Sequence, residues 1–114
     1  MKFDAGLTDV AAAGTRKKWS DDGGIGTSKR FLKAWFQAAT GNTGAVYVGI
    51  GDVSNTHGWE LMPAVAGRSA VVLELSPGDF AEPGEKKPTM LCDDIQFDAA
   101  NNGDDVSWAV LLAE

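Results

Sequence analysis

The chain has 114 residues, 44% of them hydrophobic, and a formal net charge of −6, which together predict one compact domain with a single core. No apolar run approaches the roughly 20 residues that span a membrane, and no apolar segment follows the first four residues, so we expect a soluble protein made without export. The one cysteine, Cys92, has no partner for an intrachain disulfide or a thiolate metal cluster, and we expect it to be a small buried residue.

The charges are distributed unevenly along the chain. Residues 1–33 contain seven lysines and arginines against four aspartates, whereas residues 34–114 contain three bases against twelve acids. Such sorting suggests that the basic segment has a partner of its own. Residues 1–27 also contain five glycines and no sustained hydrophobic period, so by themselves they bury too little to offset their backbone entropy. We predict an extended N-terminal arm over residues 1–27, with the alternative that it folds back on its own domain.

Spaced apolar and basic side chains in this arm suit docking in an extended conformation. The predicted docking residues are Phe3, Leu7, Arg16, Lys17, Lys18, Trp19 and Ile25. The bases and the indole at residues 16–19 are also the groups that nucleic-acid sites use. Asp21 and Asp22 follow them directly, however, and the acidic remainder of the chain would repel a polyanion. We therefore expect the arm to bind an acidic protein surface and no nucleic acid.

The segment SKRFLKAWFQAAT, residues 28–40, fits both regular structures. As a helix it would carry an apolar stripe behind a Ser28 cap. As a strand it places four apolar side chains on one face, namely Leu32, Ala34, Phe36 and Ala38. The short Asn-Thr-Gly link to the next strand suits a hairpin, so we predict the strand. Trp35 then lies opposite the core, where it could contact a neighbouring subunit.

Residues 41–58, GNTGAVYVGIGDVSNTHG, consist of a turn, a short alternating strand and a longer turn-rich segment. Their sequence resembles the sequences of small β-rich virion proteins of tailed bacteriophages. The matching pieces are Gln37-Ala38, Asn42-Thr43-Gly44, Val46-Tyr47-Val48-Gly49, Asp52-Val53-Ser54 and the G-x-x-L-x-P turn at residues 58–63. The likeness covers about residues 31–112. It implies a strand before the Asn-Thr-Gly turn and a virion accessory role, and it contains no catalytic signature.

The turn region that follows contains the chain's one histidine, His57, and a tryptophan, Trp59. Without a second histidine to bind a metal or relay protons, we expect His57 to be a solvated loop residue. Trp59 has two possible roles. It could serve as a platform for a sugar or a peptide, but we predict that it plugs the core.

Three further strands are predicted toward the C-terminus. Residues 68–75 alternate, with Val71, Leu73 and Leu75 on one face, and a Ser-Pro-Gly-Asp turn ends them. Residues 90–98 alternate again, and Asn101-Asn102-Gly103 predicts a hairpin turn into the last strand. Residues 106–112 are apolar on both faces, which indicates a central strand or a subunit interface on the second face.

Five aspartates lie close together in the sequence near this predicted hairpin. They are Asp93, Asp94, Asp98, Asp104 and Asp105. Calcium takes several oxygen ligands, but the spacing of an EF-hand loop is absent, and aspartates beside Asn-Gly suit turns. We predict turn residues, with no metal or cofactor and no catalytic residue.

The chain is therefore predicted to be all-β, with about six strands in an antiparallel sandwich or jelly-roll-like barrel over residues 28–114, preceded by the arm. The runner-up is an α+β fold with residues 28–40 helical. We expect a non-enzymatic capsid decoration (cement) protein on the outer surface of a phage virion, assembled in the host cytoplasm. Its partners would be the major capsid protein and itself, as a homotrimer. The predicted self-association residues are Trp35, Ala109 and Leu111. A tail or baseplate accessory and a carbohydrate-binding adhesion module using Trp59 are the alternatives.

Overall fold

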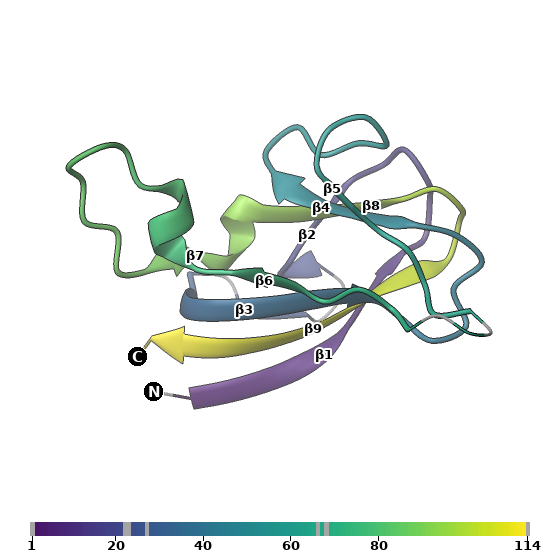
Figure 1. Ribbon diagram of the computed structural model, residues 1–114, viewed down its shortest axis with the longest axis horizontal. Coiled ribbons are helices and arrows are strands. Elements are labelled where there is room, and N and C mark those ends of the chain that lie inside the picture. The colour runs from purple at the N-terminus through teal and green to yellow at the C-terminus, as the bar shows by residue number, and fades with distance from the viewer. Residues whose placement is uncertain (1, 22–23, 27, 66, 68, 114) are drawn as a thin grey trace.

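Two antiparallel β-sheets pack face to face in the computed structural model, which describes residues 2–21, 24–26, 28–65, 67 and 69–113 (Figure 1). One sheet runs in the order β1 (Lys2–Val10), β9 (Asp104–Ala113), β3 (Arg30–Ala38) and β6 (Leu73–Leu75), with β7 (Met90–Leu91) also paired to β3. The other runs β2 (Lys17–Lys18), β8 (Ile95–Ala99), β4 (Val46–Ile50) and β5 (Trp59–Leu61). Two short 3₁₀ turns, η2 (Pro77–Phe80) and η3 (Cys92–Asp94), complete the described elements. The predicted all-β sandwich is confirmed.

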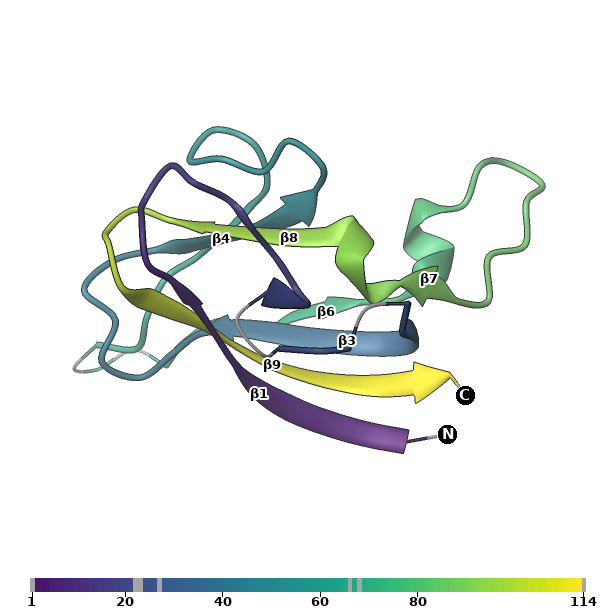
Figure 2. The same cartoon turned by 180° about the vertical axis from the view of Figure 1, so that it is seen from behind.

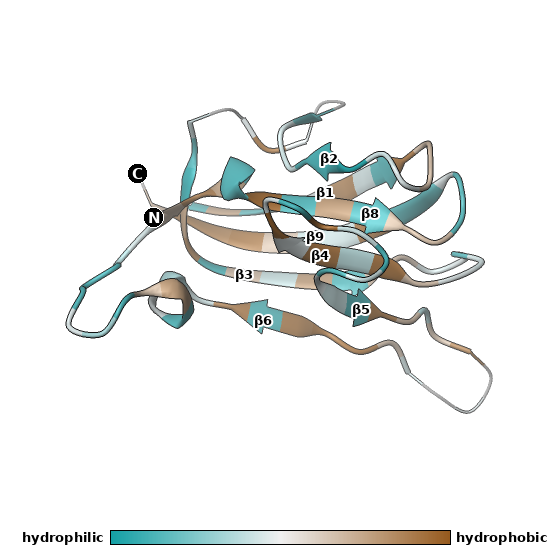
Figure 3. Ribbon diagram, turned by 90° about the horizontal axis from the view of Figure 1, so that it is seen from above, coloured by the Kyte–Doolittle hydropathy of each residue, from teal (hydrophilic) through white to brown (hydrophobic). Residues whose placement is uncertain are grey.

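The core lies between the two sheets, and alternation along each long strand fills it. The inward side chains of β9 are Val106, Trp108, Val110 and Leu112, and all are buried. Residues of the opposite sheet meet them, chiefly Val46, Val48, Ile95 and Phe97. Figure 3, seen from above, shows the four-stranded sheet lying over the five-stranded one. Because a strand has period two, each sheet keeps a second face that points away from the core.

The N-terminal segment is part of this sandwich, so the prediction of a separate arm over residues 1–27 is wrong. Strand β1 pairs with β9 along its whole length, from Lys2 opposite Leu112 to Val10 opposite Asp104. The contact is also specific, because the indole N–H of Trp108 donates to Thr8 Oγ1 at 3.0 Å. A methyl group at Gly6 would lie 2.8 Å from the Trp108 ring. The ring therefore packs directly on the backbone of β1 at this glycine.

Trp19 enters the centre of the core from the segment that follows β1. Its side chain is fully buried, and four aromatic rings surround it at centroid distances between 4.9 and 6.2 Å: Phe31, Phe36, Phe97 and Trp108. These rings come from both sheets. Ile25 is buried in the same cluster. The burial of Trp19 and Ile25 could not be predicted from the sequence, because the apolar residues of residues 1–27 are isolated and follow no hydrophobic period.

The two Asn-Gly-type turns join the sheets instead of forming hairpins, which corrects both hairpin predictions. Strand β3 lies in the five-stranded sheet and β4 in the four-stranded one, and the same holds for β9 and β8. The short strand predicted within residues 41–58 is present as β4, and the strand predicted over residues 28–40 is present as β3. The turns therefore act as crossovers at one end of the sandwich.

Asp104 ties these two crossovers together. The residue is 5% exposed, and its carboxylate accepts hydrogen bonds from the backbone N–H groups of Thr43 and Gly44 at 3.0 and 2.9 Å. The Thr43 hydroxyl lies 3.3 Å from each carboxylate oxygen. Next to it, Asn42 donates to the carbonyl of Asp105 and accepts from its N–H group. A buried charge held by several N–H groups is well compensated.

Three predicted strands differ locally from the structure. In β3 a bulge between Phe31 and Lys33 shifts the register, so that Phe31 is fully buried and Leu32 is not. Of the strand predicted over residues 68–75, residue 68 lies outside the described residues; among the others, β6 covers Leu73–Leu75, and Val71 is 60% exposed. The strand predicted over residues 90–98 is divided by η3 into β7 and β8, which belong to different sheets.

Cys92 lies in η3, where the chain passes between the sheets, and it is fully buried, as predicted. Burial raises the pKa of its thiol to about 12, with a smaller contribution from the neighbouring Asp93 carboxylate. A thiol with such a pKa is protonated at neutral pH and is a poor nucleophile. Cys92 thus serves as a small apolar residue of the core.

Replacing Trp19 by alanine should cost about 3–5 kcal/mol of unfolding free energy, because it empties the centre of the aromatic cluster. Urea unfolding followed by circular dichroism measures this loss. Lys18→Ala, an exposed neighbour on β2, is the matched control and should change stability by less than about 0.5 kcal/mol. Equal effects of the two substitutions would contradict the central role of Trp19.

Asp104→Ala should cost about 2–4 kcal/mol, because it leaves the backbone donors of Thr43 and Gly44 unpaired in a buried site. Asp104→Asn keeps one acceptor oxygen and should lose less. Urea midpoints of the two variants measure the difference. An alanine variant as stable as the native chain would show that the crossovers hold without the carboxylate.

Candidate functional site

The outer face of the five-stranded sheet gathers apolar side chains that the core does not use. Trp35 on β3 stands directly opposite Ala109 on β9, and Leu111 follows on the same side of β9. All three are partly exposed. The prediction that Trp35 lies opposite the core side chains is confirmed, and the structure brings the three predicted self-association residues onto one surface.

Strand β1 adds two strongly exposed residues to this surface. Phe3 is opposite Leu111, and Leu7 is opposite Ser107. Phe3 is 61% exposed and Leu7 59%, and the Phe3 ring lies 6.2 Å from the Trp35 ring between centroids. We call the surface formed by Phe3, Leu7, Trp35, Ala109 and Leu111 the apolar face. The strands that carry it are seen from both sides in Figures 1 and 2.

The predicted docking residues are therefore split among three places. Phe3 and Leu7 belong to the apolar face, whereas Trp19 and Ile25 are in the core. The three bases lie on the turn before β2 and on β2 itself, at the edge of the four-stranded sheet: Arg16, Lys17 and Lys18. No continuous docking segment exists, because the residues alternate between surface and interior.

A polar set fixes Trp35 on the apolar face. Its indole N–H donates to Glu74 Oε2 at 3.1 Å, and Lys33 Nζ lies 2.9 Å from Glu74 Oε1. The Lys33 ammonium also stands 6.0 Å from the centre of the Trp35 ring. The hydrogen bond from Lys33, followed by that from Trp35, lowers the pKa of the Glu74 carboxyl. These contacts hold the indole in one orientation without covering it.

A hollow of about 260 Å³ opens beside Trp35 on the same surface. Its lining comes from β1, β3 and β9 and from the residue before β6, and it includes Ala5, Trp35, Val72, Ser107 and Ala109. Val72 is 54% exposed. Ala5 and Val72 were not predicted to be parts of this surface. The alternation of Phe3, Ala5 and Leu7 along residues 3–7 was the available signal, but it is too short to separate a strand from a flexible tail.

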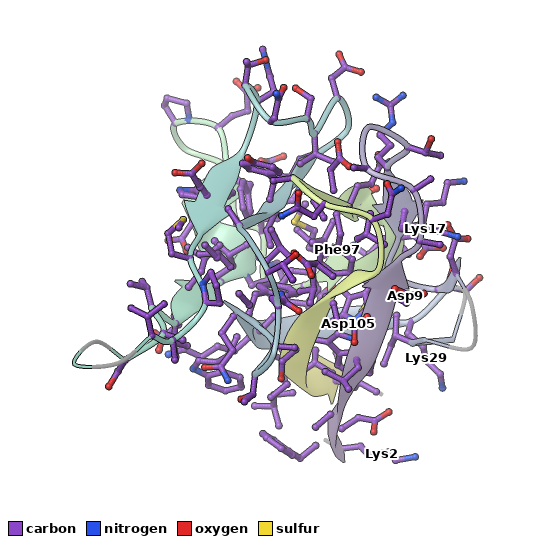
Figure 4. All side chains as sticks on the ribbon, turned by 90° about the vertical axis from the view of Figure 1, so that its right-hand side faces the viewer. Lys2, Asp9, Lys17, Lys29, Phe97 and Asp105 are labelled. Carbon is purple, nitrogen blue, oxygen red and sulfur yellow. The ribbon has the colours of Figure 1, made fainter. Side chains whose placement is uncertain are left out.

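The apolar face ends in an acidic pair. Asp9 on β1 is directly opposite Asp105 on β9, and Figure 4 shows the two labelled side by side. Partial burial raises the pKa of the Asp105 carboxyl, and a hydrogen bond and the charge of Asp9 raise it further. Arg30 lies where β3 begins, at the other end of the sheet, whereas Lys2 is opposite the inward residue Leu112 and so lies on the other face of β1. The apolar face thus has an arginine at one end and an acidic pair at the other.

A second exposed aromatic group lies at the start of β5, and it corrects the prediction that Trp59 plugs the core. Trp59 is 42% exposed and contacts Phe80 of η2 with a centroid distance of 6.3 Å. The loop residue His57 is exposed, as predicted. Both line a hollow of about 240 Å³ at the end of β4.

The aspartates that lie close together in the sequence make separate structural contacts. Asp93 accepts from the N–H and hydroxyl of Ser20, and Asp98 accepts from the N–H of Gly14. Asp104 and Asp105 are in the crossover and the acidic pair. Within the described ranges, no group of three histidine, cysteine, aspartate or glutamate side chains is arranged to hold a metal ion. In the same part of the chain, no helix is long and apolar enough to cross a membrane.

Comparisons with protein-family models, with curated proteins and with solved structures gave no significant match to this chain. The likeness to phage virion proteins remains a prediction based on the turn and strand residues quoted above.

Stability should fall as the pH rises from about the ordinary aspartate pKa of 3.8 through the raised pKa of Asp105, because the native state keeps a proton there that the unfolded chain has released. Asp9→Asn removes the facing charge. It should stabilise the protein at neutral pH by a few tenths of a kcal/mol, and the gain should vanish below pH 3.8.

Urea unfolding across this pH range measures the difference between Asp9→Asn and the native chain. Asp94→Asn, on an exposed position of η3, is the matched control and should show no such pH-dependent gain. A gain from Asp9→Asn that is the same at acid and neutral pH would contradict coupling between Asp9 and Asp105.

Proposed function

We propose that this protein is a non-enzymatic virion structural protein, a capsid decoration (cement) protein that self-associates through its apolar face on the outer surface of a phage shell. The observation that carries the proposal is the cluster of exposed apolar side chains on the outer face of one sheet, with Phe3 61% exposed and Leu7 59%. Contiguous exposed apolar surface rimmed by polar groups is typical of protein interfaces. The resemblance of residues 31–112 to small phage virion proteins supports the virion setting.

A second copy of the chain is the occupant that suits this face best. The face carries both a projection and a recess: Phe3 and Leu7 on the edge strand β1, and the hollow beside Trp35 toward β3 and β6. The projection of one copy can enter the recess of the next. Contacts between different parts of the same surface are heterologous and close into a ring when the rotation permits. We propose a trimer at a symmetry axis of the shell.

Charge supports the same arrangement. Arg30, at one end of the five-stranded sheet, could approach the acidic end of a neighbouring copy, with Asp9 and Asp105. Such complementarity favours correct orientation and faster encounter more than it adds affinity.

The major capsid protein is the second proposed partner. Arg16 and Lys18 are exposed at the edge of the four-stranded sheet, away from the apolar face, and Arg16 approaches Asp52 only at 3.5 Å. Bases in this position could pair with acidic groups of the shell while the apolar face joins the copies. A tail or baseplate accessory would use the same surfaces. Copy number per virion and immuno-electron microscopy distinguish the two roles, because a cement protein occupies the many symmetry axes of the shell and a tail part does not.

Phe3→Glu and Leu7→Glu should each weaken self-association by about tenfold or more, because each places a charge in the apolar contact. Both positions are strongly exposed, so stability should change by less than about 0.5 kcal/mol. Sedimentation velocity over a range of protein concentrations measures the oligomer, and urea unfolding measures the fold.

Val65→Glu is the matched control, since Val65 is 53% exposed but lies outside the apolar face. It should leave the oligomer unchanged. A native chain that remains monomeric at high concentration and does not bind shells depleted of the protein would overturn the proposed function.

A further inference from the structure

The hollow beside Trp59 lies on the other sheet from the apolar face and plays no part in the proposed assembly. Its lining comes from the end of β4, the start of β5 and the loop of residues 51–58 that joins them. Figure 1 shows this loop on the outer side of the four-stranded sheet. The lining of the hollow includes Ile50, Asp52, His57 and Trp59. Ile50 is also exposed, at 44%. Two large apolar side chains therefore remain open to solvent around one recess.

The loop that shapes this recess is held by its own contacts. Val53 is buried against Ala45 and Tyr47 of the adjoining strand region. Ser54 and His57 exchange two backbone hydrogen bonds, of 2.9 and 3.1 Å. The recess is thus largely formed before any ligand arrives, which reduces the entropy cost of binding.

An aromatic side chain forms one wall of the recess. Trp59 is supported by Phe80, whose ring packs against the core and meets the indole at an interplanar angle of 72°. Gly49 and Gly58 also line the recess. A methyl group at Gly58, whose φ is +135°, would lie 2.8 Å from the Val48 carbonyl oxygen, and one at Gly49 would lie 3.4 Å from Gly58 Cα. Glycine at these two positions therefore lets the loop pack closely against β4.

Polar groups stand at the rim. Asp52 supplies a carboxylate, His57 supplies an imidazole, and the Arg16 guanidinium lies 3.5 Å from Asp52 Oδ1. Carboxylate oxygens accept hydrogen bonds, and guanidinium groups donate several. An aromatic wall with a few convergent polar groups is the usual composition of a small-molecule site. Adjacent hydroxyl groups on an apolar ring would satisfy both parts of this lining.

We propose that this recess binds a neutral saccharide, with the C–H face of a pyranose ring against Trp59 and its hydroxyl groups toward Asp52 and His57. The acidic balance of residues 34–114, three bases against twelve acids, disfavours anionic sugars. Such a site would let a virion protein attach to host-surface glycans. It does not depend on self-association, because the apolar face is on the other sheet.

The test is a glycan array of neutral hexose and N-acetylhexosamine oligosaccharides, followed by calorimetric titration with the strongest binder. Trp59→Ala should weaken binding by about tenfold or more, as loss of a central aromatic contact does, and Trp59→Phe should retain part of the affinity. Trp35→Ala is the matched control, because it removes a partly exposed indole from the opposite surface.

Trp35→Ala should leave saccharide binding unchanged and weaken self-association. Trp59→Ala should weaken saccharide binding and leave the oligomer seen in sedimentation unchanged. Failure of one proposal can therefore be distinguished from failure of the other. Binding that persists in Trp59→Ala would overturn the assignment of the site. Absence of binding to every neutral oligosaccharide, or a preference for sialylated or uronic glycans or for peptides, would overturn the assignment of the ligand.

Discussion

Burial of Trp19 between the two sheets is the contact on which the rest of the molecule depends. Its ring touches aromatic side chains of β3, β8 and β9, so it joins both layers at their centre. Its indole N–H has no hydrogen-bond acceptor among the described residues, a cost that the surrounding aromatic packing must offset. Strand β1 is held at the edge of the five-stranded sheet by its pairing with β9 and by the hydrogen bond from Trp108 to Thr8. In that position β1 adds Phe3 and Leu7 to the apolar face.

The two sheets differ in how their outer faces are covered. On the four-stranded sheet, Tyr47 and Asp98 lie under loops and are almost fully buried, and burial, together with Glu60, raises the pKa of the Tyr47 hydroxyl. On the five-stranded sheet, Phe3, Leu7 and Trp35 have no such cover among the described residues. Loops therefore cover much of the outer face of one sheet, whereas the other sheet leaves Phe3, Leu7 and Trp35 open to solvent.

This division of surfaces is consistent with the function that we propose. An assembly through the apolar face would leave the four-stranded sheet and the Trp59 recess directed away from the contact between copies. Lys18, at the edge of that sheet, would stay available to the shell, whereas Arg16 lies beside Asp52 at the rim of the recess. The proposed saccharide site and the proposed oligomer are therefore compatible in one particle, and neither requires residues of the other.

The sequence by itself determined the all-β fold class. Alternation over the predicted strands at residues 28–40 and 106–112 identifies most of the inward side chains, because a strand has period two, and so Trp35, Ala109 and Leu111 could be predicted to lie on outward faces. The bulge that places Phe31 and not Leu32 in the core carries no such signal. The sequence could not determine which sheet each strand joins, since the turns at residues 42–44 and 101–103 suit hairpins and crossovers equally. Only the tertiary structure decided the places of Trp19, β1 and Trp59. Isolated apolar residues carry no periodic signal, and their burial depends on partners that are distant in the chain.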